Sequence, residues 1–193
     1  MTYKLSRNKS LVPSIRMAAA VSISLLISNA AMASEDGIRA SVLPILQQAY
    51  DNLKAEYMPV VLAAESMADP SAQKVLQRAR TMTLNERAII RGGCWDYLNR
   101  VFKQAGVERQ TVFEGKYRGG PYADADSLRS GDWLYYINHG YKDIEHSGLF
   151  IGWVDKPARQ ALILSYAGEQ RREPARYKVY DLSHVYQVMR PMP

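Results

Sequence analysis

The spacing of apolar residues changes once along this chain, and this change limits the fold class. Between residues 38 and 90, apolar residues recur at intervals of three and four, which is the spacing of amphipathic helices. Pro44 and Pro59 interrupt this segment, so two or three short helices are expected there. Asp69 followed by Pro70 predicts the start of a further helix, because proline is favoured in the first turn.

One more amphipathic helix is expected to begin at Cys94. Its apolar stripe consists of Cys94, Leu98, Val101, Phe102 and Ala105. Gly106 follows the last of these residues and is expected to end the helix in a left-handed conformation.

Strands are expected only in the last third of the chain. Residues 107–131 are rich in Gly, Pro, Asp and Ser and predict mostly loop. Runs typical of strands then cover residues 132–138, 145–154, 160–168, 175–182 and 184–191. Helices followed by antiparallel strands predict an α+β domain, with the helices packed on a sheet of about five strands.

The first 33 residues have the pattern of a secretory signal peptide. A basic leader precedes the apolar run "MAAAVSISLLI", and the "NAAMA" that follows predicts cleavage after Ala33 and export. A transmembrane anchor is the alternative, but such a helix needs about 20 apolar residues. This run is shorter and contains Ser22 and Ser24, so no stable membrane span is expected after cleavage.

The charge of the chain gives no support for a nucleic-acid partner. The chain has 25 Lys and Arg against 19 Asp and Glu, a net charge of +6. Four of the basic residues lie in the leader, so the processed chain would carry only +2. A weakly anionic partner remains compatible with this charge.

The single cysteine, Cys94, has two interpretations. It can be a small buried apolar residue, or it can be a nucleophile that works with a histidine. A nucleophilic thiol must ionise, and both the N-terminus of a helix and a nearby imidazole favour the thiolate. The backbone N–H of Cys94 would then be the first donor to an oxyanion.

Three histidines compete for the role of base. His146 begins a predicted strand and would project toward a helix end, with Gly148 on the same face leaving room for a substrate. His139 falls in a predicted turn, and His184 begins the last predicted strand, where it could lie at an edge or in the core. His146 is the favoured base, and Ser165 is the candidate for the residue that orients it. The alternative for Ser165 is that it merely ends a strand.

Four segments in order resemble the NlpC-type papain-like cysteine peptidases of bacterial cell walls. They are "CWDYLNRVFKQAGV", "DSLRSGDWLYY", "HSGLFIGW" and "LILSYAG", within residues 84–190. The resemblance implies a papain-like fold with Cys94 as nucleophile, His146 as base and Ser165 as the third residue. Gly93 and Trp95 beside the cysteine depart from the usual pattern, and the Trp and Tyr that follow it are more similar to the related CHAP amidases.

The resemblance implies a periplasmic enzyme that hydrolyses amide bonds in peptidoglycan stem peptides without a metal or organic cofactor. The domain boundaries expected are a signal peptide at 1–33, an N-terminal helical region at 34–83 and a catalytic domain at 84–193. Arg91 and Arg118 could meet stem-peptide carboxylates, but for either residue taken singly a solvated surface charge is the favoured interpretation. The alternative function is a catalytically weak or inactive papain-like module that binds wall peptide or a protein.

Overall fold

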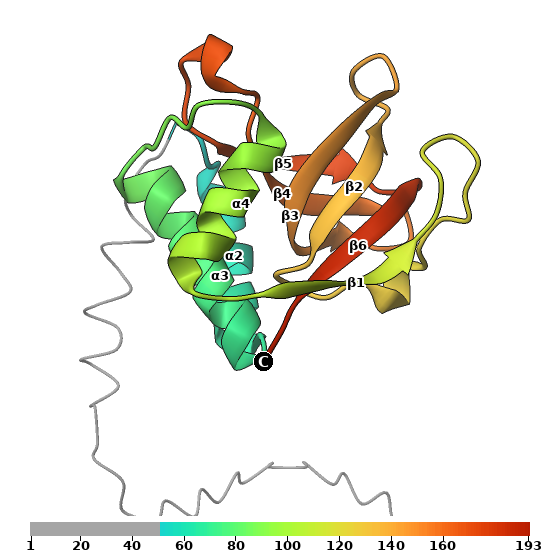
Figure 1. Ribbon diagram of the computed structural model, residues 1–193, viewed down its shortest axis with the longest axis horizontal. Helices are drawn as coiled ribbons and strands as arrows, with labels where there is room; N and C mark the ends of the chain where they lie inside the picture. The colour runs from blue at the N-terminus through green and yellow to red at the C-terminus, as the bar shows by residue number, and fades with distance from the viewer. Residues whose placement is uncertain (1–50) are drawn as a thin grey trace, which may run out of the picture.

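The computed structural model describes residues 51–193, which form an α+β fold of three α-helices and a six-stranded antiparallel sheet (Figure 1). The helices are α2 (Met58–Met67), α3 (Pro70–Arg80) and α4 (Cys94–Ala105). The strands are β1 (Arg109–Glu114), β2 (Trp133–Asn138), β3 (Ile144–Asp155), β4 (Gln160–Ser165), β5 (Arg176–Asp181) and β6 (Val185–Pro191). The prediction of an α+β class is therefore confirmed. The signal peptide and the helix expected before residue 51 lie outside the described residues.

The helix boundaries follow the sequence signals closely. Pro59 lies in the first turn of α2, and Asp69 and Pro70 stand at the start of α3, where a missing N–H is harmless. A π-helical turn, η2 (Thr81–Asn85), continues α3, and the boundary predicted between residues 83 and 84 falls inside it. None of the helices in residues 51–193 has the length and apolar character needed to cross a membrane.

The sheet has the strand order β1-β6-β2-β3-β4-β5. Five strands fall where the sequence predicted them, but the prediction that residues 107–131 are mostly loop missed β1. This strand pairs only with β6, at the edge of the sheet, and four of its six residues are exposed. An edge strand with little buried surface lacks the apolar alternation from which strands are predicted.

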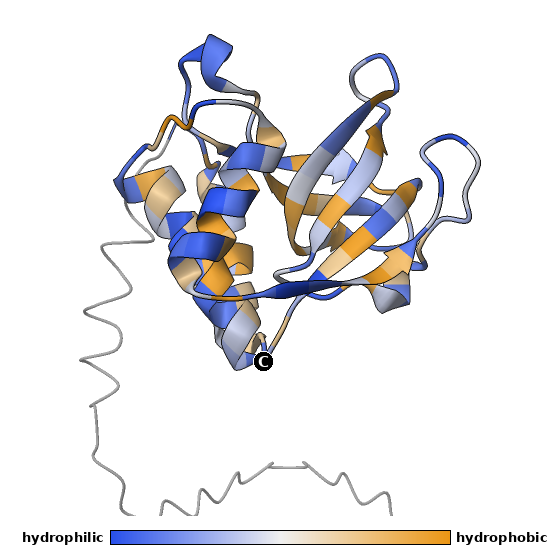
Figure 2. Ribbon diagram, in the orientation of Figure 1, coloured by the Kyte–Doolittle hydropathy of each residue, from blue (hydrophilic) through white to orange (hydrophobic). Residues whose placement is uncertain are grey.

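Alternating side chains of the sheet contribute to two hydrophobic cores (Figure 2). On one face, Leu149 and Leu164 join Leu98 and Phe102 of α4 and the apolar residues of α2 and α3. The other face holds Phe150 with residues of β2, β4 and β6. The period of two along β3 and β4 therefore separates the helix-facing core from the second core. The first core includes residues from both sides of the predicted boundary between the helical region (34–83) and the catalytic domain (84–193).

Asp132, the first residue of the strand predicted at 132–138, has a structural role. Asp132 is fully buried, and its carboxylate accepts two hydrogen bonds from Arg190 of β6, at 2.9 and 2.8 Å. The same carboxylate accepts the backbone N–H of Arg129. Asp132 thus ties the start of β2 to β6 through a bidentate pair, the strongest geometry for such a contact.

Candidate functional site

The start of α4 is shaped by two glycines that differ in their conformations. Gly92 has a φ of 99°, and a Cβ there would lie 2.1 Å from Oδ2 of Asp96. That same oxygen accepts the N–H of Gly93 at 2.8 Å. Asp96 thus caps the helix that Cys94 begins, and Gly92 gives it the space to do so.

The loop after β4 holds this helix start in place. The Tyr166 hydroxyl donates to the carbonyl of Ile90 at 2.8 Å and accepts the N–H of the same residue at 3.1 Å. Its ring stacks on Tyr97 of α4 with centroids 4.8 Å apart. Further along, the N–H of Glu169 donates to the carbonyl of Gly92 at 3.0 Å. These contacts join the segment before Cys94 to the β4–β5 loop, more than 70 residues later in the sequence.

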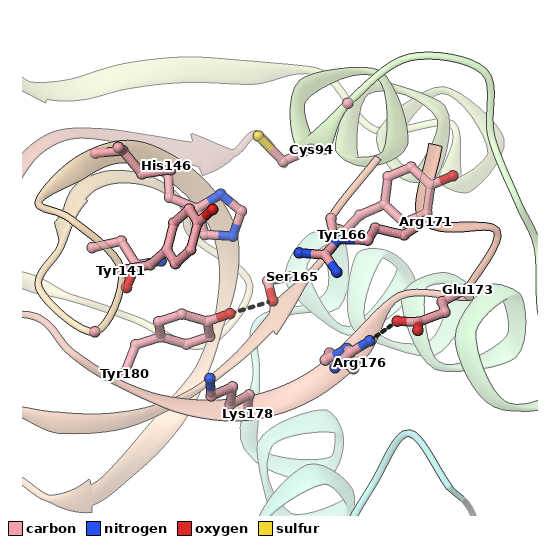
Figure 3. A pocket seen from close by; sticks show the side chains of 15 residues that line it. Cys94, Tyr141, His146, Ser165, Tyr166, Arg171, Glu173, Arg176, Lys178 and Tyr180 are labelled. Atoms are coloured by element: carbon pink, nitrogen blue, oxygen red, sulfur yellow. Dashed lines mark hydrogen bonds and ion pairs between the residues drawn. The ribbon is translucent and has the colours of Figure 1, made fainter. Parts of the chain in front are cut away.

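A pocket of about 490 Å³ lies at this junction, and Cys94, His146 and Ser165 all line it (Figure 3). Cys94 is the first residue of α4, His146 lies near the start of β3, and Ser165 ends β4. The three residues that the sequence singled out are therefore brought together on one cavity. Whether they act there as nucleophile, base and orienting residue stays a prediction.

The environment of Cys94 favours the thiolate. Burial by itself raises the pKa of the thiol, but interactions with His146 and Ser147 outweigh it, and together they lower the pKa from 9.0 to about 7. Ser147 is buried, and its hydroxyl has no hydrogen-bond partner of ordinary geometry among residues 51–193, so it remains available to the sulfur. The thiolate is therefore accessible at neutral pH, where an ordinary cysteine is almost entirely protonated.

Two aromatic rings pack on the His146 imidazole, and among residues 51–193 the Cys94 thiol is the one side chain that hydrogen-bonds to it. Tyr136 stands directly opposite His146 on β2, and the two rings meet edge to face with centroids 5.6 Å apart. Tyr180 of β5 packs at a tilt on the imidazole, with centroids 5.9 Å apart. The ring orientation is thus set by packing between two tyrosines.

Ser165 does not contact His146 as the orienting residue would. Its hydroxyl lies 2.9 Å from the Tyr180 hydroxyl, and the two share a hydrogen bond. Ser165 is buried at the pocket wall, so this bond satisfies it. The structure therefore joins Ser165 to the imidazole only through the ring of Tyr180.

Gly148 is needed for packing, which differs from the role expected for it. It is buried, and a Cβ there would lie 2.3 Å from Cγ2 of Ile163 and 3.1 Å from the carbonyl oxygen of Leu164. The missing side chain makes room for the second core and leaves no space open to a substrate.

The other two histidines pair with each other between the β2–β3 turn and the β5–β6 turn. Nε2 of His139 lies 2.8 Å from Nδ1 of His184, and Nδ1 of His139 lies 2.7 Å from the Asp143 carboxylate. Neither ring lines the pocket that contains Cys94. Of the three histidines, His146 alone shares the cavity with the thiol.

Tyr180 and Ser147 are site residues that the sequence did not single out, and the contact of Tyr136 with His146 was not predicted either. Tyr180 lies on a strand that was predicted, but its place beside His146 depends on the order β3-β4-β5 and on the strand register. Tyr136 and Ser147 follow from the pairing of β2 with β3. Alternation along these strands was the one available signal, and it does not give the register.

Comparison with known proteins adds no relative. No protein-family model matches this chain, and no curated protein matches it in sequence. The similarity to NlpC-type peptidases therefore stays a prediction that depends on the four sequence segments.

Proposed function

We propose that this protein is a cysteine hydrolase that cleaves amide bonds in peptidoglycan stem peptides. The observation that supports this most directly is the lowered pKa of Cys94, about 7, next to His146 in a pocket open to ligand. A structural cysteine would have the raised pKa that burial alone produces.

The proposed reaction begins with the thiolate. It attacks the carbonyl carbon of the scissile amide, and the carbonyl oxygen becomes an oxyanion. The first backbone N–H groups of α4 have no acceptor within the helix, so the N–H of Cys94 can donate to that oxygen. His146 gives a proton to the leaving amine, and a thioester to Cys94 remains.

Hydrolysis of the thioester completes the cycle. His146 takes a proton from water, the hydroxide attacks the thioester carbonyl, and the thiolate leaves. The free carboxylic acid is released and both side chains return to their starting states. None of these steps needs a metal or an organic cofactor.

The substrate class comes from the similarity of the four segments to cell-wall peptidases and from the expected export. We propose that residues 1–33 are removed and that the processed protein acts in the periplasm. The intact mass of protein purified from the cell envelope tests this, since cleavage after Ala33 fixes one mass.

Digestion of purified sacculi tests the activity. Wild-type protein is expected to release peptide fragments whose masses identify the bond cut, and Cys94→Ser is expected to release none while it keeps its fold. Cosedimentation with sacculi measures binding by both proteins. Binding without any release by the wild type over a long incubation would contradict the hydrolase.

The second candidate is a papain-like module that binds wall peptide without cleaving it. It is favoured by the surroundings of His146, where no side chain of residues 51–193 other than Cys94 hydrogen-bonds to the imidazole to orient it. Such a module would bind sacculi equally well as wild type and as Cys94→Ser.

A further inference from the structure

One side of the Cys94 pocket is strongly basic. Three cationic side chains line it, from Arg171, Arg176 and Lys178, against the single carboxylate of Glu173. All four residues are exposed, so the charges are available to a ligand in the cavity. The excess of positive charge comes from the β4–β5 loop and from β5.

The strand register directs two of these cations into the pocket. Arg176 of β5 stands opposite Ser165 of β4, and Lys178 stands opposite Ile163. Directly opposed residues project from the same face of a sheet, so both cations share the face on which Ser165 lies. Arg171 reaches the same cavity from η4 (Glu169–Arg171), and its guanidinium extends into the pocket (Figure 3).

Two of the three cations have no carboxylate partner in the described part of the chain. Arg176 forms an ion pair with Glu173. Lys178 lies over the ring of Tyr180, with its ammonium 5.5 Å from the centroid, and the side chain of Arg171 makes no hydrogen bond or ion pair with residues 51–193. With three cations against the one carboxylate of Glu173, the charged side chains on this side of the pocket carry a net charge of about +2.

The arginines that the sequence pointed to lie elsewhere. Arg91 is exposed and does not line the pocket, and Arg118 donates to the carbonyl oxygen of Asp143 at 3.4 Å. The cations at the cavity come instead from η4 and β5, and no sequence pattern indicated that these elements lie beside Cys94.

We propose that Arg171 and Lys178 form a subsite for a carboxylate of the ligand, on the β4–β5 side of Cys94. A planar guanidinium can bind a carboxylate through two hydrogen bonds, and the ammonium adds a point charge. The inference deepens the proposed function, on which it rests for the kind of substrate. It selects peptides that carry a free carboxylate close to the scissile amide over peptides in which that group is an amide.

Thiol chemistry tests the subsite without requiring hydrolysis. The anionic reagent sulfonatoethyl methanethiosulfonate and the neutral hydroxyethyl methanethiosulfonate differ in charge and have the same reactive group. In each case the thiolate of Cys94 attacks the sulfenyl sulfur, a mixed disulfide forms and methanesulfinate leaves. The ratio of the two rates, anionic over neutral, measures the electrostatic potential at the sulfur.

The double variant Arg171→Gln/Lys178→Gln is expected to lower this ratio roughly threefold to tenfold at low ionic strength, and salt is expected to shrink the difference. Lys74→Gln/Arg129→Gln is the matched control, because it removes two exposed cations outside the pocket. Its ratio should equal that of the wild type. Thermal unfolding at the wild-type temperature shows that Arg171→Gln/Lys178→Gln is folded, and an unchanged ratio in that variant overturns the proposal.

Stem peptides then test the ligand. Wild-type protein should cleave a peptide with a free carboxylate next to the scissile amide at a higher kcat/KM than its carboxamide analogue, and Arg171→Gln/Lys178→Gln should remove the preference. If no peptide is cleaved, peptide protection of Cys94 against the neutral reagent gives the same comparison. If no peptide is cleaved but the carboxylate peptide protects Cys94 better than its amide, only the proposed function is contradicted. If the acid and the amide protect Cys94 equally, the subsite is contradicted.

Discussion

The hydroxyl oxygens of Ser165 and Tyr180 lie 2.9 Å apart, and the ring of Tyr180 packs on His146 with centroids 5.9 Å apart. The polar residue at the end of β4 therefore reaches the imidazole through an aromatic ring. In a Cys-His site the third residue usually fixes the second ring nitrogen by a hydrogen bond. Here the position of the imidazole depends on packing between Tyr136 and Tyr180.

Ser165→Ala and Tyr180→Phe are expected to have nearly the same effect, because each removes one half of a single hydrogen bond. Each should cost about 1 kcal/mol in the free energy of unfolding, and the double variant should cost less than the sum. Tyr180→Ala removes the ring beside His146 and should also raise the pH midpoint of Cys94 alkylation by about half a unit. A shift in that midpoint with Ser165→Ala but not with Tyr180→Phe would show that Ser165 contacts His146 directly.

The alkylation of Cys94 is expected to follow the lowered pKa of its thiol. Since only the thiolate reacts, the rate with iodoacetamide should rise with pH and reach half its maximum near pH 7. His146→Ala removes the main influence that lowers the pKa and leaves burial, which raises it. The hydrogen bonds from Ser147 remain, so the midpoint should move up toward the ordinary value of 9.0, and Ser147→Ala should give a smaller upward shift.

Iodoacetamide rates measured across the pH range check this, with Cys94→Ser as the control that removes the only thiol of the chain. As pH falls, sacculus digestion by the wild type should decline with the same midpoint as the alkylation of Cys94. If His146→Ala titrates like the wild type, the imidazole does not control the thiol.

The positions of Cys94 and His146 could be predicted from residue patterns. The residues around them could not, because their positions depend on the register of the strands. The start of α4 at Cys94 and its end at Gly106 followed from local signals, an apolar stripe and a glycine in the left-handed conformation. His146 could be placed at the beginning of a strand for the same reason. These features depend on a few neighbouring residues, which the sequence presents directly.

The residues that surround the thiol and imidazole depend on contacts between distant segments. Lys178 reaches the pocket because β5 pairs with β4, and Arg171 reaches it from η4 in the loop that joins these two strands. Tyr166 reaches Ile90 across 76 positions of the sequence. Long-range pairing of this kind is set by the packing of the whole sheet, so alternation along one strand cannot give it.

The two glycines before Cys94 are expected to respond very differently to alanine. At Gly92 the φ of 99° is strained for alanine, and the Cβ would lie 2.1 Å from the Asp96 carboxylate. The loss in the free energy of unfolding should be about 2 kcal/mol or more, from backbone strain and the loss of the cap. Gly93 has an extended conformation and no atom within 4 Å of its Cβ position, so Gly93→Ala should cost less than about 1 kcal/mol.

Urea unfolding of both variants gives this comparison, because the two changes add the same methyl group one residue apart. Asp96→Ala should reproduce part of the loss at Gly92, and adding Gly92→Ala to it should cost less than in the wild type. Equal losses at Gly92 and Gly93 would mean that Asp96 does not cap α4.

Gly148 and Gly152 provide the last comparison, which separates packing from room for a substrate. A Cβ at Gly148 would lie 2.3 Å from Cγ2 of Ile163, whereas at Gly152 the nearest atom is Cγ1 of Val60 at 3.5 Å, an ordinary contact. Gly148→Ala should therefore cost about 1–3 kcal/mol through overpacking, and Gly152→Ala well below about 1 kcal/mol. Thermal and urea unfolding measure both losses. In the background Ile163→Ala the cost of Gly148→Ala should shrink, because the colliding methyl group is gone. A Gly148→Ala variant that keeps full stability but no longer digests sacculi would show instead that this glycine leaves space for the substrate.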